Sequence, residues 1–364
     1  MLDKSIKINQ LKLQLNSTLL DALRKMDETY KRLLLIFEGE KFINVLSIGD
    51  IQRAIIQNKS LDSPVSDVLR KETRLANIGD SLDFIKSQML QFKAECMPMI
   101  DDENNFVDVF FWEEFFDDNQ RNSQLQLQLP VVIMAGGKGT RLKPFTNVIP
   151  KPLLPIGEKT IIEEIMDRFL KVGCNQFFLS VNYKAETIKQ YFSELNSPKY
   201  IINYFQEDKP LGTAGSLFLI KNRINTTFFV SNCDIVIEED YSEILNYHFD
   251  NKNELTIVSA LKHYPIPYGT IKTKEGGLLK ELIEKPEITF QINTGFYILE
   301  PHLLDEIPIN SVLHITQLIE KLLNEERNVG VFPVSEKSWK DIGNWNEYIS
   351  SINPYIINHC NKIS

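Results

Sequence analysis

A strand that runs into a glycine-rich turn is the strongest chemical signal in this sequence. Five apolar residues, Val131 to Ala135, predict a buried strand, and three glycines follow almost at once: Gly136, Gly137 and Gly139. Glycine leaves no side chain between the backbone amides and a ligand, and it adopts backbone conformations closed to other residues. With a helix expected to start near Thr140, the turn would form a concave row of N–H groups suited to phosphate.

Two cations follow this turn. Arg141 carries a planar guanidinium that can bind two phosphate oxygens at once, and Lys151 lies between two prolines that stiffen the chain around it. A Walker A loop is excluded, because no glycine precedes Gly137 and Lys138 at the required spacing. The dinucleotide fingerprint G-x-G-x-x-G is also excluded, because Leu142 stands where its third glycine should be.

The run from Gly136 to Ile156 resembles the signature of the sugar-1-phosphate nucleotidyltransferases. In that family G-G-x-G-T-R-L-x-P-x-T is followed by P-K-P-L-L-P-I, and every one of these letters is present here. The resemblance covers roughly residues 130–350, about two thirds of the chain. It implies an enzyme that joins a nucleoside triphosphate to a sugar 1-phosphate and releases pyrophosphate. It also implies a first loop that binds the nucleotide, through Ala135, Gly136, Gly137, Gly139, Thr140 and Arg141.

Strand and helix candidates alternate from Val131 onward. A helix is expected over 160–171 and over 186–195, and a strand over 176–181 and over 201–205. Such alternation is typical of an α/β fold with a Rossmann-like, mixed but mostly parallel sheet covered on both faces. The nucleotidyltransferase resemblance implies the same fold.

A second glycine-bearing loop, residues 206–216, opens a further helix candidate. In the nucleotidyltransferases the corresponding loop lines the base pocket, and Gln206, Gly212 and Thr213 stand at matching positions. Later segments match those that line the sugar pocket of the family. The resemblance assigns that pocket to Gly269, Glu284, Lys285 and Asn293.

Two aspartates are the candidate metal ligands. Asp234 ends an apolar strand candidate, and ligand chemistry in open α/β sheets collects at the carboxyl ends of strands. In the family the aspartate at this position binds Mg²⁺, and Asp341 matches a second metal-binding aspartate. Glycosyltransferases with related sheets carry D-x-D here, whereas this chain has the single acid of Cys233-Asp234-Ile235. That difference counts against a glycosyltransferase.

The reaction that the resemblance implies needs charge neutralisation more than acid–base chemistry. The sugar phosphate is already an anion at neutral pH, so it attacks the α-phosphorus without a general base while pyrophosphate leaves opposite. Positioning the two polyanions can lower the activation barrier by ~8 kcal/mol or more, and preorganised charges would supply the rest of the barrier lowering. We expect the catalytic groups to be Arg141 on the β- and γ-phosphates, Lys151 on the α-phosphate, Lys285 on the sugar phosphate, and Asp234 with its Mg²⁺.

Residues 1–120 contain a weak repeat of about 60 residues, about 1–60 and 61–120. Each copy predicts an amphipathic helix, an apolar strand, an acidic turn, a strand and a second helix. The pattern resembles a tandem pair of CBS domains, modules that often bind adenine nucleotides and associate face to face. The first copy carries the ribose-binding pair of that family as Ser47 and Asp50, whereas Phe111 and Glu114 replace it in the second. One nucleotide site and a homodimer are therefore expected.

The remaining boundaries and composition narrow the class of protein. Residues 121–129 have linker composition with a short strand expected over 124–129, residues 130–350 form the transferase domain, and 351–364 a tail. A formal net charge of −9 argues against nucleic-acid binding. The four cysteines lack C-x-x-C spacing, and neither a signal peptide nor an apolar run of membrane length is visible. A cytoplasmic protein is expected.

The base and the sugar stay open at this point. The compact Pro210–Ser216 loop resembles guanylyltransferases more than thymidylyl or uridylyl enzymes. A transferase domain preceded by CBS domains is also the organisation of enzymes that make GDP-glucosamine for legionaminic acid, a surface sugar, and this chain resembles them. Mannose 1-phosphate and heptose 1-phosphate are the alternative substrates. An inactive nucleotide-sensing scaffold and a glycosyltransferase are the alternative classes.

Overall fold

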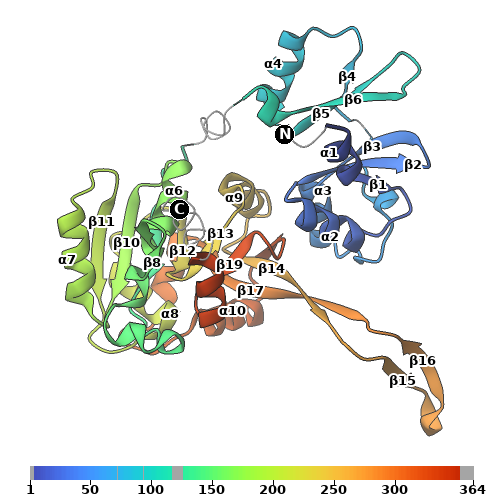
Figure 1. The fold of residues 1–364 in the computed structure, drawn as a ribbon. Helices are drawn as coiled ribbons and strands as arrows, with labels where there is room; N and C mark the ends of the chain where they lie inside the picture. Colours follow the sequence, from blue (N-terminus) through green and yellow to red (C-terminus); the bar gives the residue numbers. More distant parts are fainter. Residues whose placement is uncertain (1–3, 72, 93, 117–125, 353–364) are drawn as a thin grey trace, which may run out of the picture. The chain divides into compact units, whose positions relative to one another are not determined.

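The computed structural model describes residues 4–71, 73–92, 94–116 and 126–352 (Figure 1). The chain forms two compact units, Met1–Gln124 and Leu125–Ser364. No helix among the described residues is long and apolar enough to cross a membrane. Cys360 and most of the expected tail, residues 353–364, lie outside the described ranges.

The first unit contains the same order of elements twice. After helix α1 (Lys4–Leu11), each copy has a short strand, a helix and an antiparallel hairpin, and the short strand pairs in parallel with the first strand of the hairpin. The first copy comprises β1 (Lys12–Gln14), α2 (Leu19–Thr29), β2 (Leu33–Glu38), β3 (Lys41–Ser47) and α3 (Ile48–Ile56). The second comprises β4 (Ala76–Asn77), α4 (Leu82–Phe92), β5 (Cys96–Ile100) and β6 (Phe106–Phe111).

The two copies differ at their ends. Helix α3 is fixed by a capping box, in which Ser47 and Asp50 bond each other's backbone N–H groups. The second helix expected in the later copy is only a 3-10 turn, η2 (Trp112–Glu114), among the described residues. Phe111 has no hydroxyl with which to cap a helix there, which accounts for part of the difference.

The second unit is built on a seven-stranded sheet of order β11-β10-β7-β12-β17-β14-β18. Strands β11, β10, β7 and β12 run parallel, as do β14 and β18, and β17 alone is antiparallel to both of its neighbours. This confirms the predicted mixed, mostly parallel sheet. The strands are β7 (Val131–Met134), β10 (Gln176–Val181), β11 (Ile201–Gln206), β12 (Phe228–Asn232), β14 (Leu255–Pro265), β17 (Glu287–Leu299) and β18 (Val329–Val334).

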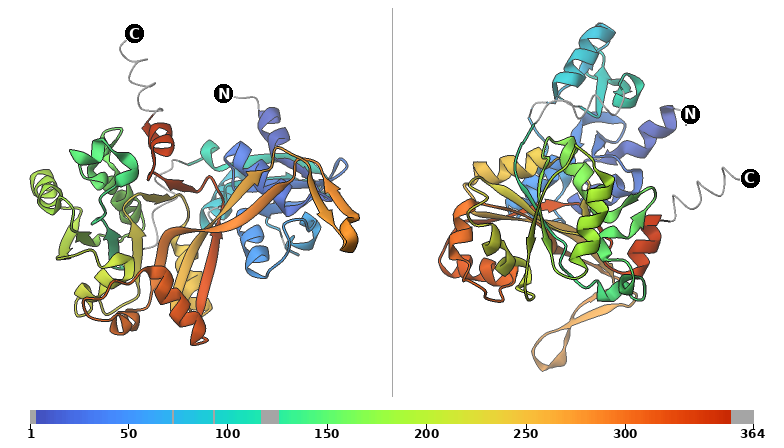
Figure 2. Two further views of the ribbon diagram at one scale, coloured as in Figure 1. Left: turned by 90° about the horizontal axis from the view of Figure 1, so that it is seen from below. Right: turned by 90° about the vertical axis from the view of Figure 1, so that its left-hand side faces the viewer.

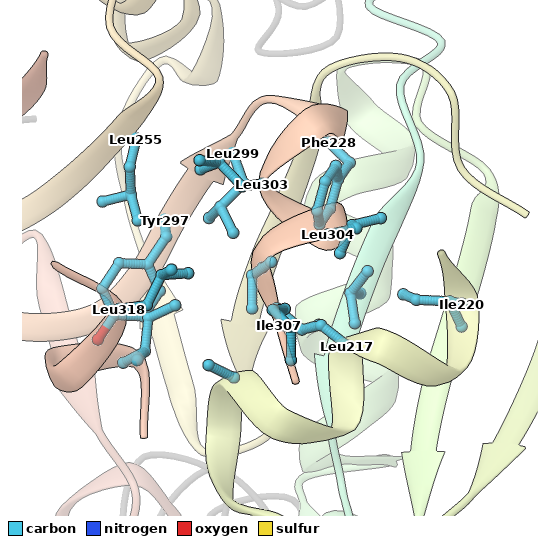
Figure 3. Packing of buried hydrophobic residues seen from close by; sticks show 14 of the residues in the cluster. Leu217, Ile220, Phe228, Leu255, Tyr297, Leu299, Leu303, Leu304, Ile307 and Leu318 are labelled. Carbon is cyan, nitrogen blue, oxygen red and sulfur yellow. The ribbon is translucent and has the colours of Figure 1, made fainter. Parts of the chain in front are cut away.

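Both faces of the sheet are buried, as neighbouring residues of one strand show. Phe229 stacks against Phe169 and Tyr241, whereas the next residue, Val230, packs into a different cluster with Leu217. Figure 3 shows this second cluster and Figure 2 the helices on either side of the sheet. The covering helices are α6 (Ile161–Lys171), α7 (Ala185–Leu195), α8 (Gly212–Gly215), α9 (Tyr241–Asp250), α10 (Ile315–Asn324), η6 (Ser216–Ile220) and η8 (Pro301–Glu306).

Local signals in the sequence account for most of these boundaries. Helix α6 begins after Thr160, whose hydroxyl and the Glu163 carboxylate form a capping box, and its chain turns away at Gly173, which has a φ of 84°. The predicted strand 176–181 is confirmed residue for residue. The strand predicted over 124–129 is wrong where the structure describes it, because residues 126–129 join the fold through the amide of Leu127 and form no ladder.

A long two-stranded arm leaves this sheet. Strands β14 and β17 pair beyond the rest of the sheet as far as Pro265 and Glu287, and a second ribbon continues from them. That ribbon consists of β15 (Thr270–Thr273), the turn η7 (Glu275–Gly277) and β16 (Leu279–Ile283). The arm projects from the body of the second unit (Figures 1 and 2).

Candidate active site

The glycine-rich turn follows the central strand of the parallel half-sheet. Strand β7 pairs on both sides, with β10 and β12, so the turn leaves the sheet at its carboxyl edge. The amide of Ala135 is bonded to the carbonyl of Ser180 and so extends the sheet, whereas a Cβ on Gly137 would meet nothing within 4 Å. The turn is therefore open at Gly137, whereas Gly136 and Gly139 pack against neighbouring side chains.

The turn closes on itself through Gly139. This residue has a φ of 60°, and a Cβ there would lie 2.8 Å from Cγ2 of Thr146 and 3.0 Å from Cβ of Lys151. The helix expected near Thr140 is only one 3-10 turn, η3 (Thr140–Leu142), because the chain turns again at Lys143. Because so short a turn has little helix dipole, the groups that it offers to an anion are the loop amides and Arg141.

Two cations and two carboxylates converge beside this turn. Lys151 and Asp234 form a buried ion pair. Arg141, with its side chain 63% exposed, lies 3.7 Å from Asp234 Oδ2 and 3.9 Å from Asp341 Oδ2. The structure thus brings together four of the residues predicted for chemistry, from three separate stretches of the sequence.

A small two-stranded sheet brings the two aspartates together. Strand β13 (Ile235–Ile237) begins directly after Asp234 and pairs antiparallel with β19 (Trp339–Asp341), so that Ile235 lies opposite Asp341. The amide of Ile342 also donates to the carbonyl of Asp234 at 2.8 Å. Backbone pairing, rather than side-chain attraction, therefore holds two like charges close to each other.

Gly343 is a site residue that the sequence analysis did not single out. A Cβ on it would lie 2.5 Å from Asp341 Oδ1, 2.7 Å from Asp234 Oδ2 and 2.9 Å from a guanidinium nitrogen of Arg141. Its amide donates to Asp341 Oδ1 at 2.8 Å. Only a residue without a side chain fits between these charges, and a glycine two residues after an acid was the available signal.

The segment after Gly343 fastens this acidic strand to the signature loop. Trp345 donates its indole N–H to the carbonyl of Lys143 at 3.0 Å and packs against the ring of Phe145. The hydroxyl of Tyr348 donates to the carbonyl of Pro155 at 3.0 Å. The position of Asp341 is therefore tied to the loop that carries Arg141 and Lys151.

Burial and the neighbouring charge of Asp234 raise the pKa of Asp341, against the Gly343 amide and the cations Arg141 and Lys151. A raised pKa means that the ionised carboxylate is held at an energetic cost, which a bound cation would relieve. Mg²⁺ is usually held by one or two carboxylates together with phosphate oxygens and water. Asp234 and Asp341 fit that donor set, and the described residues contain no larger cluster of His, Cys, Asp or Glu that could hold a metal ion.

Glu207 is a second residue that the sequence analysis missed. Its buried carboxylate accepts hydrogen bonds from Ser180 Oγ at 2.7 Å and from the amide of Leu211 at 2.8 Å. It would also lie 3.4 Å from a Cβ on Gly136, and its carbonyl accepts from the side chain of Asn182. Glu207 thus joins the first glycine turn, the end of β10 and the second glycine loop.

The predicted base-pocket residues are held by their own neighbours. Gln206 ends β11, and its side-chain oxygen accepts from Lys189 at 2.9 Å. The hydroxyl of Thr213 accepts from the amide of Ile315, so that it helps to cap α10. Gly212 has a φ of 78°, and a Cβ there would lie 2.6 Å from the carbonyl of Leu313. This loop is thus fixed by residues 311–315.

The predicted sugar-pocket residues fall into two groups. Asn293 lies near the carboxyl end of β12, because its side chain accepts from the amide of Gly295, which packs against the side chain of Asn232. Gly269, Glu284 and Lys285 lie on the arm and are exposed. The ladder between Asn293 and the end of β17 at Glu287 spans about 20 Å at ~3.3 Å per residue. In this conformation of one chain the two groups are separate.

In the first unit the structure brings Ser47 and Asp50 into contact with two arginines. The buried carboxylate of Asp50 accepts from Ser47, from Arg53 and, at 2.6 Å, from Arg70. Burial alone would raise the pKa of Asp50, but the hydrogen bonds from Ser47 and Arg70 outweigh it and lower the pKa. Both guanidiniums remain about half exposed.

Comparison with known families agrees with the geometry of the second unit. The family model described as "Nucleotidyl transferase" matches residues 130–356, which is more than half of the chain. The chain belongs to the nucleotidyl transferase family. The match covers every element that builds the charge cluster, from β7 to Gly343.

Several relatives within the family are guanylyltransferases by name. The chain is 29% identical over 236 residues to "Probable mannose-1-phosphate guanylyltransferase 2" of rice, Oryza sativa subsp. japonica, covering 63% of this chain and 65% of that protein. It is 32% identical over 236 residues to "Mannose-1-phosphate guanyltransferase 2" of Candida glabrata, covering 62% of this chain and 64% of that protein. The chain thus spans less than two thirds of the length of these curated relatives.

Among solved structures, HddC from Yersinia pseudotuberculosis is similar to this chain at 26% identity with a TM-score of 0.50. The similarity covers 62% of this chain and 99% of HddC. A glucose-1-phosphate thymidylyltransferase described as putative, from Bacillus anthracis, is 19% identical with a TM-score of 0.51 over 62% of this chain and 95% of its own. At that identity the second likeness concerns the fold alone.

The raised pKa of Asp341 predicts that Asp341→Asn makes the ligand-free protein more stable at neutral pH. Because the folded-state pKa is raised, the ionised carboxylate destabilises the fold at pH values above it, and this cost disappears below the unfolded value of 3.8. We expect the Tm of the variant to exceed that of the wild type at pH 7, with the difference shrinking as the pH falls toward 4. Adding Mg²⁺ should raise the Tm of the wild type more than that of the variant.

Thermal unfolding followed by circular dichroism measures both effects. Asp305→Asn, which neutralises an exposed carboxylate of the same unit, is the matched control and should shift the Tm at neither pH. A variant that is less stable than the wild type at pH 7 would contradict the electrostatic argument.

Glu207→Ala should weaken nucleotide binding without changing binding of the second substrate. The substitution leaves a buried amide and the Ser180 hydroxyl without their acceptor, so the two glycine loops lose their common support. We expect KM for the nucleotide to rise roughly tenfold or more, and Glu207→Gln, which keeps an acceptor for Leu211, to retain most of the affinity. Initial-rate kinetics with each substrate varied in turn measure this.

Glu163→Ala is the matched control, since it removes another buried carboxylate that caps α6 away from the glycine loops. It should lower the Tm and leave KM for the nucleotide unchanged. Equal values of KM in wild type and Glu207→Ala would refute the positioning role.

Proposed function

We propose that this protein is a sugar-1-phosphate guanylyltransferase of the cytoplasm, which joins GTP to a sugar 1-phosphate and releases pyrophosphate. The observation that carries the proposal is the cluster of Arg141, Lys151, Asp234 and Asp341 at the open glycine turn. Two cations beside a row of free amides suit a triphosphate, and two carboxylates suit the metal ion that accompanies it. The family match supports the same class of reaction.

In this mechanism the chain's own residues hold charge and orient the reactants. The Gly136–Gly139 turn and Arg141 bind the β- and γ-phosphates, and Lys151 faces the α-phosphate. Lys151 is paired with Asp234, so an incoming phosphate and metal ion would take over both partners of that pair. No residue needs to act as a general base, because the sugar phosphate is already ionised.

Asp234 and Asp341 are the residues that would hold Mg²⁺. When bound, the metal ion would supply positive charge that offsets the negative charge of the phosphates. Its two carboxylates are prearranged by the β13–β19 pairing, and the cost of keeping them together is visible in the raised pKa of Asp341.

GTP and glucosamine 1-phosphate are the substrates that we propose. Guanine is supported by relatives such as those of rice and Candida, which are named guanylyltransferases. Glucosamine 1-phosphate follows from the resemblance to enzymes that pair CBS domains with this transferase in legionaminic acid synthesis. Mannose 1-phosphate, the sugar in the names of those relatives, is the principal alternative, and heptose 1-phosphate is another. Thymidylyl or uridylyl transfer would change the nucleotide and keep the reaction.

A matrix of four nucleoside triphosphates against glucosamine, mannose, heptose and glucose 1-phosphates tests the proposal. Pyrophosphate release should require Mg²⁺ and be fastest with GTP and glucosamine 1-phosphate. Asp234→Asn should lower kcat by at least ~100-fold, because it removes a charged metal ligand while keeping the volume of the side chain. The exposed Asp305→Asn variant should be unchanged.

Each alternative has its own outcome in this assay. If pyrophosphate release is fastest with GTP and mannose 1-phosphate, the proposed reaction stands and the proposed sugar is wrong. No pyrophosphate from any pair would indicate an inactive nucleotide-sensing scaffold. Hydrolysis of a sugar nucleotide without pyrophosphate would indicate a glycosyltransferase.

The first unit is proposed to be a CBS pair that binds one adenine nucleotide. Ser47 and Asp50 lie together at the start of α3, as ribose binding requires, and Arg53 and Arg70 present two half-exposed guanidiniums beside them. Ribose hydroxyls at Asp50 would displace Arg70, which then becomes available to a phosphate. The exchange would keep the buried carboxylate hydrogen-bonded throughout.

Calorimetry on the full chain with AMP and ADP tests this site. We expect one molecule bound per chain, and Asp50→Asn should abolish the binding heat while Asp67→Asn, a surface carboxylate of the same unit, should leave it intact. Saturating GTP, which occupies the transferase site, should not compete with AMP. Absence of heat with both nucleotides would contradict a nucleotide site in the first unit.

A further inference from the structure

The arm of the second unit exposes an unusual number of large apolar side chains. Nine of the large hydrophobic residues exposed in the described structure lie between residues 264 and 290. They include Leu278, which is 68% exposed, and Tyr268, which is 75% exposed. Soluble proteins rarely leave apolar side chains grouped in this way unless the surface binds something.

These side chains are grouped by strand register. In the outer ribbon Ile271 lies directly opposite Leu282 across the ladder, so both point to one face. In the inner ribbon Tyr264 lies opposite Ile288. Phe290 is two residues further along the strand of Ile288, and its ring centroid lies 6.1 Å from that of Tyr264. Each ribbon thus presents an apolar face of its own.

Nothing among the described residues of the second unit forms another layer over the outer ribbon. Strands β15 and β16 make a sheet of two strands, and every residue from 271 to 285 is exposed. A two-stranded ribbon is at best marginally stable in water without a surface to pack on. A partner that covers these faces would therefore stabilise the arm itself.

The exposed apolar surface has the size of a stable interface. The nine side chains are on average about half exposed, and side chains of this kind present ~150–250 Å² each when bare. Together they expose on the order of 800 Å², counted over both faces of the arm, against the ~800 Å² that one partner contributes to a standard interface.

We propose that the arm is a dimerisation element whose partner is the arm of a second copy of this chain. The outer part of the arm, residues 270–286, carries four lysines and three glutamates, and Lys272 and Glu281 already pair at 2.8 Å. The excess is one positive charge, so two such surfaces approach each other with little net repulsion, whereas nucleic acid or an anionic membrane would need a larger excess of lysine and arginine. Two copies related by a twofold axis would place apolar face on apolar face and leave the charges at the rim.

Sedimentation velocity of the full chain over a range of concentrations tests this proposal. The wild type should be a dimer. Leu282→Lys should raise the dimer dissociation constant at least tenfold, and the double variant Ile271→Lys with Leu282→Lys should be monomeric at micromolar concentration. Leu323→Lys is the matched control, because Leu323 is a leucine of the same unit with 57% exposure against 61% for Leu282. It should remain a dimer.

Chemical cross-linking locates the dimer interface on the arm. Leu282→Cys treated with a short bismaleimide should give a covalent dimer in high yield, and the wild type treated in the same way measures the background from its own cysteines. A monomeric wild type overturns the proposal. Leu82→Lys changes an exposed leucine of α4 in the first unit. A dimer that persists in the arm double variant but dissociates in Leu82→Lys would also overturn the proposal, because the interface would then belong to the first unit.

Discussion

Two carboxylates held close together, and the charges gathered to offset them, are the constraint on which the second unit depends. Backbone pairing between β13 and β19 puts Asp234 beside Asp341, although their like charges repel. Lys151 and Arg141 supply two positive charges, and Gly343 leaves the room in which Arg141 and the two aspartates meet. In the ligand-free protein the cluster is close to neutral. Its components are the groups that a metal–triphosphate complex would engage.

This arrangement separates the parts of the site that are fixed from those that are not. The glycine turn, Glu207 and the two aspartates lie on or beside the central sheet and are bonded to one another through buried contacts. Gly269, Glu284 and Lys285 lie on an exposed ribbon that has no packed support among the described residues of its unit. The proposed nucleotide site is therefore preorganised in a single chain, whereas the arm residues proposed for the sugar pocket have no such support from the other described residues of their unit.

In the first unit the candidate ligand residues already bond one another. Its two copies each bury a small core, and the Ser47–Asp50 capping box is a helix device before it is a ligand site. The two arginines on Asp50 show how a buried carboxylate is satisfied without a ligand. A nucleotide there has to replace interactions that already exist, which favours modest affinity and responsiveness to concentration.

The sequence alone determined the local features of this protein, and the tertiary structure decided how they combine. Glycines, caps and apolar runs predicted the phosphate turn, helix α6 and strand β10, because those signals act over a few residues. Arg141, Lys151, Asp234 and Asp341 were recognised by a family pattern, yet their meeting around Gly343 needed the β13–β19 pairing across a hundred residues. Glu207 and the exposure of the arm were invisible in one dimension, because burial and the lack of it arise only when distant segments pack together.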